Sequence, residues 1–281
     1  MNTIEVKILE GVGAEIGGID LAAGISATQF ADIKRVFSDE GLIFFRDQSI
    51  DEKQHIAFAE MWGHINVNRF FAAHEDYPQI AMVTKEPDQT GNIGGGWHAD
   101  HSYDVEPAMG SILVARELPE TGGDTFFSNM YKVFDSLSQG LQETLLGLNA
   151  VHSAKYAFGS QNTYHRGEVT GDRIGNSESA DAMPDSIHPA VITHPLSGRK
   201  ALYVNPGFTR HFEGWSREDS VPILEYLFAI ARQEQFVTRF HWEPGSIAFW
   251  DNRATWHLAQ NDYQGQRREM HRITIEGCAL T

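Results

Sequence analysis

The apolar positions of the chain change from helical spacing near the N-terminus to short strand-like runs further along. Residues 10–20 mix small apolar groups with glycine, which predicts short strands and turns. Ser26 suits a helix N-cap, and apolar residues from Phe30 to Phe37 follow at helical spacing. Leu42–Phe45 is continuously apolar and predicts a buried strand, after which a second helix is expected from about Asp51 to Gly63.

From about residue 80 the pattern consists of many short apolar runs separated by Gly and Pro turns. This arrangement is typical of a sandwich or jelly roll, so we expect an all-β core with flanking helices (α+β). The expected strands are Ile80–Thr84, Gly110–Ala115, Asp124–Phe127, Ala190–Thr193, Leu202–Val204, Ser246–Trp250 and Ile273–Ile275.

Two helices and one long polar segment interrupt these runs. Helical spacing predicts one helix over Tyr131–Leu148 and another over Ser220–Arg232. Residues 160–186 are polar and aperiodic, which indicates a functional loop, and we predict a lid there. We find no repeat and no linker, so residues 1–281 are interpreted as a single domain with a helical N-terminal part.

Composition and charge limit the partners. The chain has 281 residues, 41% of them hydrophobic, and a formal net charge of −16, which repels phosphate backbones and anionic lipid. No apolar run is long enough to span a bilayer, and the N-terminus does not read as a secretion signal. The single cysteine, Cys278, rules out an internal disulfide and fits a cytoplasmic location. We therefore expect no nucleic acid or membrane partner, but a small-molecule substrate and a homo-oligomer.

Candidate chemistry first appears at Trp97-His-Ala-Asp. In a strand, residues two apart face the same side, so His98 and Asp100 would present an imidazole and a carboxylate together. These are two of the three ligands of a facial triad, which suits non-haem Fe(II) and leaves open coordination positions. The pair alone is weak support, because exposed His and Asp are common.

Further candidates lie downstream. His257 follows the strand-like run Ser246–Trp250 and a turn. Arg268 and Arg272 are four residues apart, which is strand spacing for side chains on one face. They lead into the apolar Ile273–Ile275, which favours an inward orientation over a pair of surface charges.

At this point the chain resembles the taurine dioxygenase and phenoxyalkanoate-herbicide dioxygenase family, whose members depend on Fe(II) and 2-oxoglutarate. The shared order of several motifs carries the resemblance over nearly the whole chain. The motifs are Gly13–Leu21, Leu42–Gln48, Trp97–Asp100, Glu117–Thr125, Thr193–Lys200, Val204–Phe208, Phe249–Arg253 and Met270–Arg272.

The resemblance implies that the core is a double-stranded β-helix (jelly roll), and it implies a role for each matching residue. His98, Asp100 and His257 match the iron ligands of the family. Thr125 and Arg268 match the groups that hold the distal carboxylate of 2-oxoglutarate, and Arg272 matches the arginine that meets an anionic group of the substrate. The implied reaction hydroxylates a C–H bond with O2, while 2-oxoglutarate is converted to succinate and CO2.

The expected substrate follows from positions at which this sequence differs from family members that act on taurine. Asn66 or Asn68 stands at the position of a histidine, and Gly94-Gly-Gly stands where an asparagine is expected. Several aromatic residues fall in segments that line the pocket in the family, which favours an apolar substrate body. We expect an aryloxyalkanoate-like acid, with a taurine or alkyl sulfonate or sulfate dioxygenase as the alternative. The expected substrate-binding residues are Arg272, Asn68, Phe71, Tyr103, Phe158 and Phe208.

Two alternatives from other classes remain open. A zinc hydrolase would also use His, Asp and His ligands, but it leaves Thr125, Arg268 and Arg272 without a role. A non-catalytic jelly-roll binding module leaves an intact ligand set without a purpose. We interpret Trp97 and Trp250 as core aromatics.

Overall fold

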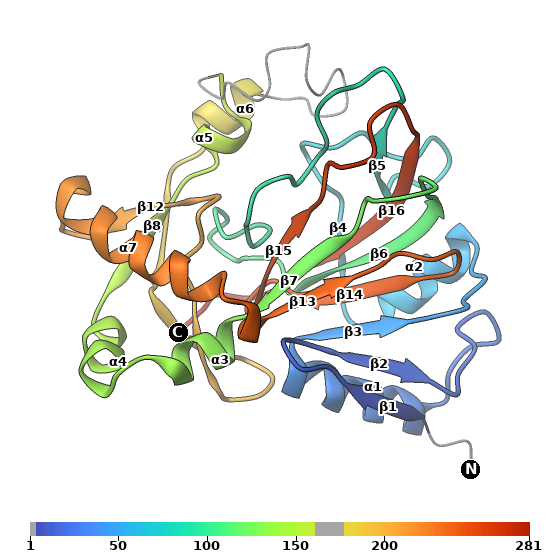
Figure 1. Cartoon of the computed structure of the whole chain (residues 1–281), viewed down its shortest axis with the longest axis horizontal. Helices are drawn as coiled ribbons and strands as arrows, with labels where there is room; N and C mark the ends of the chain where they lie inside the picture. The colour runs from blue at the N-terminus through green and yellow to red at the C-terminus, as the bar shows by residue number, and fades with distance from the viewer. Residues whose placement is uncertain (1–3, 161–176) are drawn as a thin grey trace.

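An eight-stranded sheet forms the centre of the computed structural model, which describes residues 4–160 and 177–281 (Figure 1). Both β4 (Ile65–Asn66) and β5 (Ala81–Lys85) pair with the same strand, β16. The other strands, in spatial order, are β1 (Glu5–Ile8), β2 (Ala14–Gly17), β3 (Leu42–Phe45), β14 (Ile247–Asp251), β6 (Gly110–Glu117) and β16 (Arg268–Ile275).

Residue alternation gives this sheet two apolar faces. In β3, Ile43 and Phe45 pack on one side, and Leu42 and Phe44 pack on the other, because successive side chains of a strand point to opposite faces. The first side is covered by α1 (Ala27–Glu40) and α2 (Glu52–Glu60). The central strands are therefore buried on both faces of the sheet, which explains why Leu42–Phe45 is apolar at every position.

The first helix begins and ends where its sequence predicts. The side chain of Ser26 accepts a hydrogen bond from the backbone N–H of Gln29, and the side-chain oxygen of Gln29 accepts one from the backbone N–H of Ser26. Gly41 ends the helix with φ of 71°, a left-handed conformation that glycine adopts without strain, and its N–H donates to the carbonyl of Phe37. This turn leads the chain directly into β3.

A second β layer faces the inner side of the large sheet. It consists of β13 (Val237–Phe240), β7 (Thr125–Asn129) and β15 (Thr255–Ala259), in that spatial order. Phe127 and Phe240 from this layer pack with Phe44 and Trp250 of the large sheet. The ring centroids of Phe44 and Phe240 lie 3.9 Å apart, so the two layers are in direct contact.

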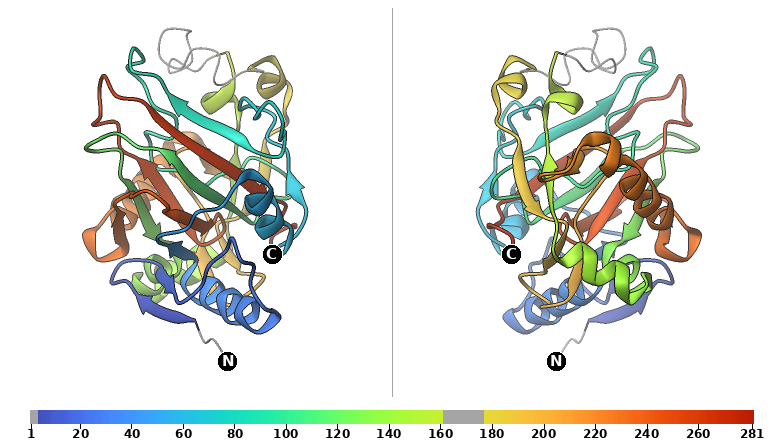
Figure 2. Two further views of the ribbon diagram at one scale, coloured as in Figure 1. Left: turned by 90° about the vertical axis from the view of Figure 1, so that its right-hand side faces the viewer. Right: turned by 90° about the vertical axis from the view of Figure 1, so that its left-hand side faces the viewer.

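The remaining elements pack outside the second layer. Figure 1 shows α4 (Gln139–Leu146) and α7 (Arg217–Ala231) on the side of the molecule away from α1, and Figure 2 shows the same molecule turned by 90°. The helix α3 (Met130–Ser136) lies between α4 and α1, and the Tyr131 hydroxyl donates to the carbonyl of Ser38 in α1. Two smaller sheets, with orders β12-β8-β9 and β10-β11, complete this side. Their bounds are β8 (Asn149–His152), β9 (Ser186–Pro189), β10 (Val191–Thr193), β11 (Lys200–Leu202) and β12 (Thr209–Phe212). A β core with flanking helices is thus confirmed.

The prediction of one helix over Tyr131–Leu148 is wrong. The chain forms α3 (Met130–Ser136) and α4 (Gln139–Leu146), with Leu137 extended between them. The hydroxyl of Ser136 donates to the carbonyl of Val133, which shows how serine competes with helix continuation. The side-chain amide of Gln142 donates to two carbonyls near the break, so the polar groups released there are satisfied.

The last long helix begins earlier than predicted. It is α7 (Arg217–Ala231), capped by Ser216, and it is followed by the short 3-10 helix η3 (Glu234–Phe236). Within residues 4–160 and 177–281, the helices are too short or too polar to cross a membrane.

The predicted lid lies mostly outside the described residues, which omit 161–176. On either side of these residues are α5 (Lys155–Phe158) and α6 (Ser177–Ala182), so residues 177–182 form a helix where we expected irregular chain.

A fully buried ion-pair network follows β14. The carboxylate of Asp251 accepts hydrogen bonds from Arg253 Nε at 2.8 Å and Nη2 at 2.7 Å, and from His194 Nε2 at 3.0 Å. Burial alone would raise the pKa of Asp251, but Arg253 and His194 hold that pKa below its ordinary value. The stabilisation is therefore present above the ordinary carboxyl pKa and is lost as the pH falls towards the folded-state value.

We predict that Asp251→Asn lowers the free energy of unfolding by about 3–5 kcal/mol, because the change leaves buried Arg253 without its counter-charge. Urea denaturation at neutral pH measures the loss. Asp135→Asn is the control, since the Asp135–Arg199 pair is exposed and should be worth about 1 kcal/mol or less. Equal losses in the two variants would contradict the assignment of a stabilising network.

Candidate active site

His98, Asp100 and His257 converge at one point between the two β layers. His98 Nε2 lies 3.5 Å from Asp100 Oδ1, and His257 Nε2 lies 3.7 Å from Asp100 Oδ2. One ligand-type atom of each residue lies within 4.8 Å of those of the other two. This spacing allows a single metal ion to reach all three side chains, as in a facial set of two imidazoles and one carboxylate.

The backbone that places these ligands differs from the prediction. His98 was expected in a strand, but it forms only an isolated bridge with His257, through His98 N to His257 O at 3.1 Å and the reverse pair at 2.8 Å. Asp100 lies in a turn. Gly207 allows a neighbouring loop to approach, since a Cβ there would lie 2.7 Å from the Cβ of His98. Pairing with β15, rather than strand alternation, thus brings the ligands together.

Hydrogen bonds and charges set the state of the three side chains. His98 Nδ1 lies 2.7 Å from the carbonyl of Gly96, so Nδ1 carries the hydrogen and the Nε2 lone pair faces Asp100. Burial alone would raise the pKa of Asp100, but Arg272 and the two histidines hold it well below its ordinary value. Burial and the neighbouring His98 lower the pKa of His257. The cluster therefore offers an ionised carboxylate between two imidazole rings.

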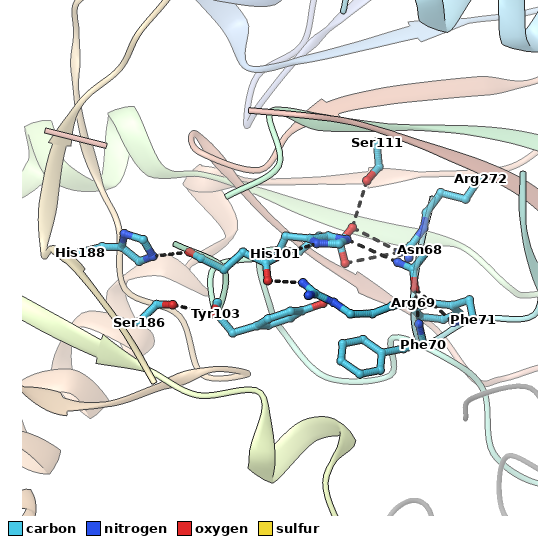
Figure 3. A network of polar contacts seen from close by, with 12 residues as sticks. Asn68, Arg69, Phe70, Phe71, His101, Tyr103, Ser111, Ser186, His188 and Arg272 are labelled. Carbon is cyan, nitrogen blue, oxygen red and sulfur yellow. Dashed lines mark hydrogen bonds and ion pairs between the residues drawn. The ribbon is translucent and has the colours of Figure 1, made fainter. Parts of the chain in front are cut away.

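Two side chains of the large sheet contact the carboxylate of Asp100. Arg272 Nη1 lies 3.3 Å from Asp100 Oδ2, and the hydroxyl of Ser111 donates to the same oxygen at 3.2 Å. Figure 3 shows Ser111 and Arg272 approaching from neighbouring strands. Both residues are buried, so the orientation of the carboxylate is fixed by the sheet.

Arg268 and Thr125 face the same space from opposite layers. Arg268 and Arg272 are both buried and lie on one face of β16, as their spacing predicts. Neither Nε nor Nη2 of Arg268 has a hydrogen-bond partner among the described residues. The hydroxyl oxygen of Thr125 accepts from Trp242 Nε1 at 3.0 Å, so its own hydrogen is free to be donated. These donors form a site for an anion.

A cavity of about 310 Å³ connects the cluster with both arginines. Its size is in the range of small-molecule sites, and its wall is mainly apolar. The lining residues are Phe71, Val83, Asn92, Ile93, Gly94, Gly95, Gly96, Trp97, His98, Asp100, Leu113, Thr125, Tyr156, Ala157, Phe158, Gly207, Phe208, Trp250, His257, Ala259, Arg268 and Arg272.

The predicted substrate-binding residues divide into two groups. Phe71, Phe158 and Phe208 line the cavity together with Arg272. Asn68 and Tyr103 do not line it. The Asn68 side chain accepts from the backbone of Phe70 and Phe71, and Tyr103 is buried behind Phe158 and Phe208 in an aromatic cluster.

Several lining residues were not predicted. Trp97 and Trp250 were interpreted as core aromatics, yet both contribute to the wall, and Tyr156 does so from α5. Leu113 in β6 is paired with Arg272 in β16. A correct prediction of this strand pairing would have placed Leu113 beside Arg272 in the pocket wall. Nothing in the local sequence around Tyr156 distinguishes it from a surface residue.

A second group of ligand-type side chains consists of Glu52, His74 and His271. In this group Arg116 Nε donates to His271 Nδ1 at 3.1 Å, and His271 Nε2 lies 3.2 Å from a Glu269 oxygen. Both ring nitrogens of His271 are therefore engaged, and the Arg116 charge opposes a cation there. The cluster of His98, Asp100 and His257 is the better metal site.

Comparisons with known proteins agree with this geometry. The profile of the family described as "Taurine catabolism dioxygenase TauD, TfdA family" matches residues 5–274. An alpha-ketoglutarate-dependent 2,4-dichlorophenoxyacetate dioxygenase of Cupriavidus pinatubonensis is 32% identical, with 93% of each chain covered. An alpha-ketoglutarate-dependent sulfonate dioxygenase of Saccharomyces cerevisiae is 28% identical over 95% of this chain, which spans only 65% of the length of that relative.

Solved structures show the same similarity. A taurine dioxygenase from Burkholderia xenovorans has a TM-score of 0.82 and 30% identity, covering 99% of this chain and 92% of its own. AAD-2 in complex with Mn(II) and N-oxalylglycine has a TM-score of 0.81 and 25% identity, with 99% of both chains covered. The family uses Fe(II), 2-oxoglutarate and O2, and the resemblance seen in the sequence is confirmed. The chain belongs to the TauD/TfdA family of 2-oxoglutarate-dependent dioxygenases.

Proposed function

We propose that this protein hydroxylates a C–H bond of a small anionic organic acid, using Fe(II), 2-oxoglutarate and O2 and releasing succinate and CO2. The observation that carries the proposal is one cavity that joins the His98, Asp100 and His257 cluster to two buried arginines. A zinc hydrolase does not account for both arginines, and a binding module does not account for the cluster.

The three ligand side chains fit Fe(II). The cluster supplies two imidazole nitrogens and one ionised carboxylate, a donor set that leaves positions open for a chelating co-substrate and for oxygen. Ser111 and Arg272 hold the carboxylate, and the carbonyl of Gly96 fixes the tautomer of His98, so the ligands are pre-oriented. When bound, iron with 2-oxoglutarate and O2 supplies the oxidation of the C–H bond.

Arg268 and Thr125 fit the distal carboxylate of 2-oxoglutarate. A guanidinium offers parallel N–H donors to a carboxylate, and Arg268 has two buried donors without a partner in the described chain. Burial lowers the pKa of the Arg268 guanidinium, so a carboxylate at this point would stabilise the charge. The hydroxyl of Thr125 adds a donor from the opposite layer.

Arg272 fits the anionic group of the substrate. Its Nη1 is paired with Asp100, whereas its buried Nε has no partner among the described residues. The Phe71 ring lies over the guanidinium, with Arg272 Cζ 4.4 Å from the ring centroid. Phe158, Phe208 and Tyr156 continue the aromatic wall, so an acid with an aromatic or bulky apolar body would bury its apolar surface there and exclude water.

The cavity disfavours taurine itself. Taurine carries an ammonium group in addition to its sulfonate, and a nearby ionised carboxylate gives a buried ammonium its strongest stabilisation. Among the described lining residues, Asp100 is the only carboxylate, and it is already engaged by Arg272 and Ser111. An aryloxyalkanoate is therefore our first candidate, and an alkyl sulfonate or sulfate without an ammonium is the second, because the relatives include both activities.

A substrate panel tests the proposal. We predict that phenoxyacetate or 2-phenoxypropionate drives succinate release at least about tenfold faster than taurine, since the loss of one charged contact costs more than 1.4 kcal/mol. Succinate is measured with hexyl sulfate as the alternative anion and phenoxyethanol as the matched neutral control. If taurine is the only compound that is turned over, the substrate assignment is wrong. If none of the panel acids increases succinate release, the substrate assignment also fails, and the proposal is confined to the use of 2-oxoglutarate.

We also propose that the two β layers form a double-stranded β-helix. The support is that Phe127 and Phe240 of the small layer pack against Phe44 and Trp250 of the large sheet, with the ligand cluster between the layers. The homo-oligomer and the single domain over residues 1–281 stay predictions.

A further inference from the structure

The side chain of Asn68 links the pocket wall to the metal-ligand segment. Its Oδ1 accepts from the backbone N–H of Phe70 at 2.9 Å and of Phe71 at 3.1 Å, and its Nδ2 lies 3.4 Å from His101 Nε2. Figure 3 shows Asn68, Phe70, Phe71 and His101 side by side. Asn68 therefore attaches the backbone that carries Phe71 to the residue that directly follows Asp100.

His101 fixes the orientation of this amide. Its Nδ1 lies 2.8 Å from Asp104 Oδ2, and because a carboxylate only accepts, Nδ1 carries the hydrogen. The Nε2 lone pair then accepts from the amide of Asn68, whose Oδ1 stays free for the two backbone N–H groups. His101 is buried and has a φ of 59°, which is uncommon outside glycine and indicates that its surroundings hold it in place.

A second connection runs beside the first. Arg69 forms an ion pair with the Asp104 carboxylate, so two successive residues of the 68–71 segment are attached to the 98–104 segment. The backbone of the latter segment is itself anchored to β9, where His188 Nε2 donates to the carbonyl of Asp104 at 2.9 Å and Ser186 Oγ to that of Tyr103 at 2.7 Å. We call Asn68, Arg69, His101 and Asp104 the clasp.

The clasp closes a ring of contacts around the substrate-anion site. Asn68 holds the backbone of Phe71, the Phe71 ring lies over Arg272, and Arg272 contacts Asp100, which precedes His101. The N–H donors of the guanidinium lie in its plane, so an anion binds along an edge, where Nε is unpartnered among the described residues, while Phe71 covers one face. A displaced Phe71 would uncover that face and loosen the direction of approach.

We propose that Asn68 is a positioning residue that, through the clasp, holds Phe71 over Arg272 and thereby sets the affinity for the anionic substrate without touching it. The inference rests on the proposed function in one respect, the assignment of Arg272 to the substrate anion. Asn68 therefore acts on selectivity through the pocket wall, and the clasp connects that wall to the segment that carries Asp100.

The first test requires no substrate. A ring above a guanidinium shifts the Arg272 Nε–H resonance, which is assigned in the NMR spectrum by its absence in Arg272→Lys, and Phe71→Leu gives its position without the ring. Asn68→Ala should move the signal towards the Phe71→Leu position. The matched control is Asn149→Ala, since Asn149 is exposed and its amide donates only to Glu213. An unmoved signal in Asn68→Ala would overturn the proposal.

The second test separates positioning from general damage. With phenoxyacetate as the probe, Asn68→Ala should reduce kcat/KM about 10- to 100-fold, as small displacements at a reacting site do, mainly through a higher KM. The KM for 2-oxoglutarate and the amount of bound iron should stay within about twofold of wild type, because the side chain of Asn68 bonds to Phe70, Phe71 and His101. Asn68→Asp keeps the backbone acceptor but loses the donor to His101, so an intermediate effect is expected.

The outcomes distinguish the two proposals. If the wild-type protein oxidises no panel acid, the proposed function fails, while the NMR measurement still decides whether the clasp positions Phe71. If Asn68→Ala moves the Arg272 signal but leaves the KM for phenoxyacetate unchanged, the claim that the clasp sets substrate affinity is wrong. A parallel loss of bound iron and of 2-oxoglutarate affinity would show a structural role instead and would also overturn it.

Discussion

Replacing Asp100 with alanine is expected to lower both bound iron and succinate release by more than about 100-fold. Replacing a residue that only hydrogen-bonds to a metal ligand lowers metal affinity or activity roughly 10–100-fold, so the loss of a charged ligand itself should lower them further. Asp100 is the only carboxylate of the cluster, and its pKa lies well below the ordinary value, so it contributes a full negative charge. Metal analysis after anaerobic loading and a succinate assay measure the two losses.

Two further variants make this result specific. Asp100→Ala also removes the partner of buried Arg272, so His98→Ala is tested beside it, because that change leaves the Asp100–Arg272 pair intact. Asp88→Ala is the control, since Asp88 is exposed. If His98→Ala and Asp100→Ala both hold iron and release succinate like Asp88→Ala, the metal site is not the cluster of His98, Asp100 and His257.

Replacing Arg268 with alanine is expected to weaken 2-oxoglutarate binding by about 2–5 kcal/mol, because a buried charged hydrogen-bond partner is lost. At 1.4 kcal/mol per tenfold, this corresponds to roughly 30-fold to several-thousand-fold in affinity. Arg268→Lys keeps the charge but not the planar fork and should fall between wild type and alanine. Anaerobic titration of the visible absorption of the iron–2-oxoglutarate complex measures the affinity directly.

Arg267, the residue directly before β16, provides a matched control. It precedes Arg268 but forms ion pairs with Glu86, Glu117 and Glu269 near the surface, so Arg267→Ala should leave 2-oxoglutarate affinity nearly unchanged. Equal affinities in the Arg267 and Arg268 variants would remove Arg268 from the co-substrate site. Thr125→Val, which deletes one neutral donor, should cost about 0.5–1.5 kcal/mol.

The sequence predicts those features of the site that depend on the spacing of residues within one strand. Arg268 and Arg272 share a face of β16 because side chains alternate along any strand. The same argument failed for His98 and Asp100, which lie at an isolated bridge and a turn. They still meet, because backbone pairing with His257 holds His98, and Arg272 and Ser111 hold Asp100.

The helix predictions show a similar limit. Ser26 and Gly41 bound α1 because capping uses groups within a few residues of each other. The break at Leu137 was not predicted, because Val133, Leu137 and Leu145 follow the spacing of one continuous helix. All three residues are buried. Apolar periodicity reports burial, and two short helices that pack on the same core satisfy it as well as one long helix.

By itself, the sequence determined the family, the ligand triad as a hypothesis and the buried strand at Leu42–Phe45, because ordered motifs and apolar runs are properties of the covalent chain. Only the tertiary structure decided which side chains form the pocket wall and which groups Asn68 contacts. Phe71 reaches Arg272, and Asn68 reaches His101, across long stretches of chain whose approach depends on the packing of whole layers. No local pattern encodes such a contact, since its free energy arises from groups that are neighbours only after folding.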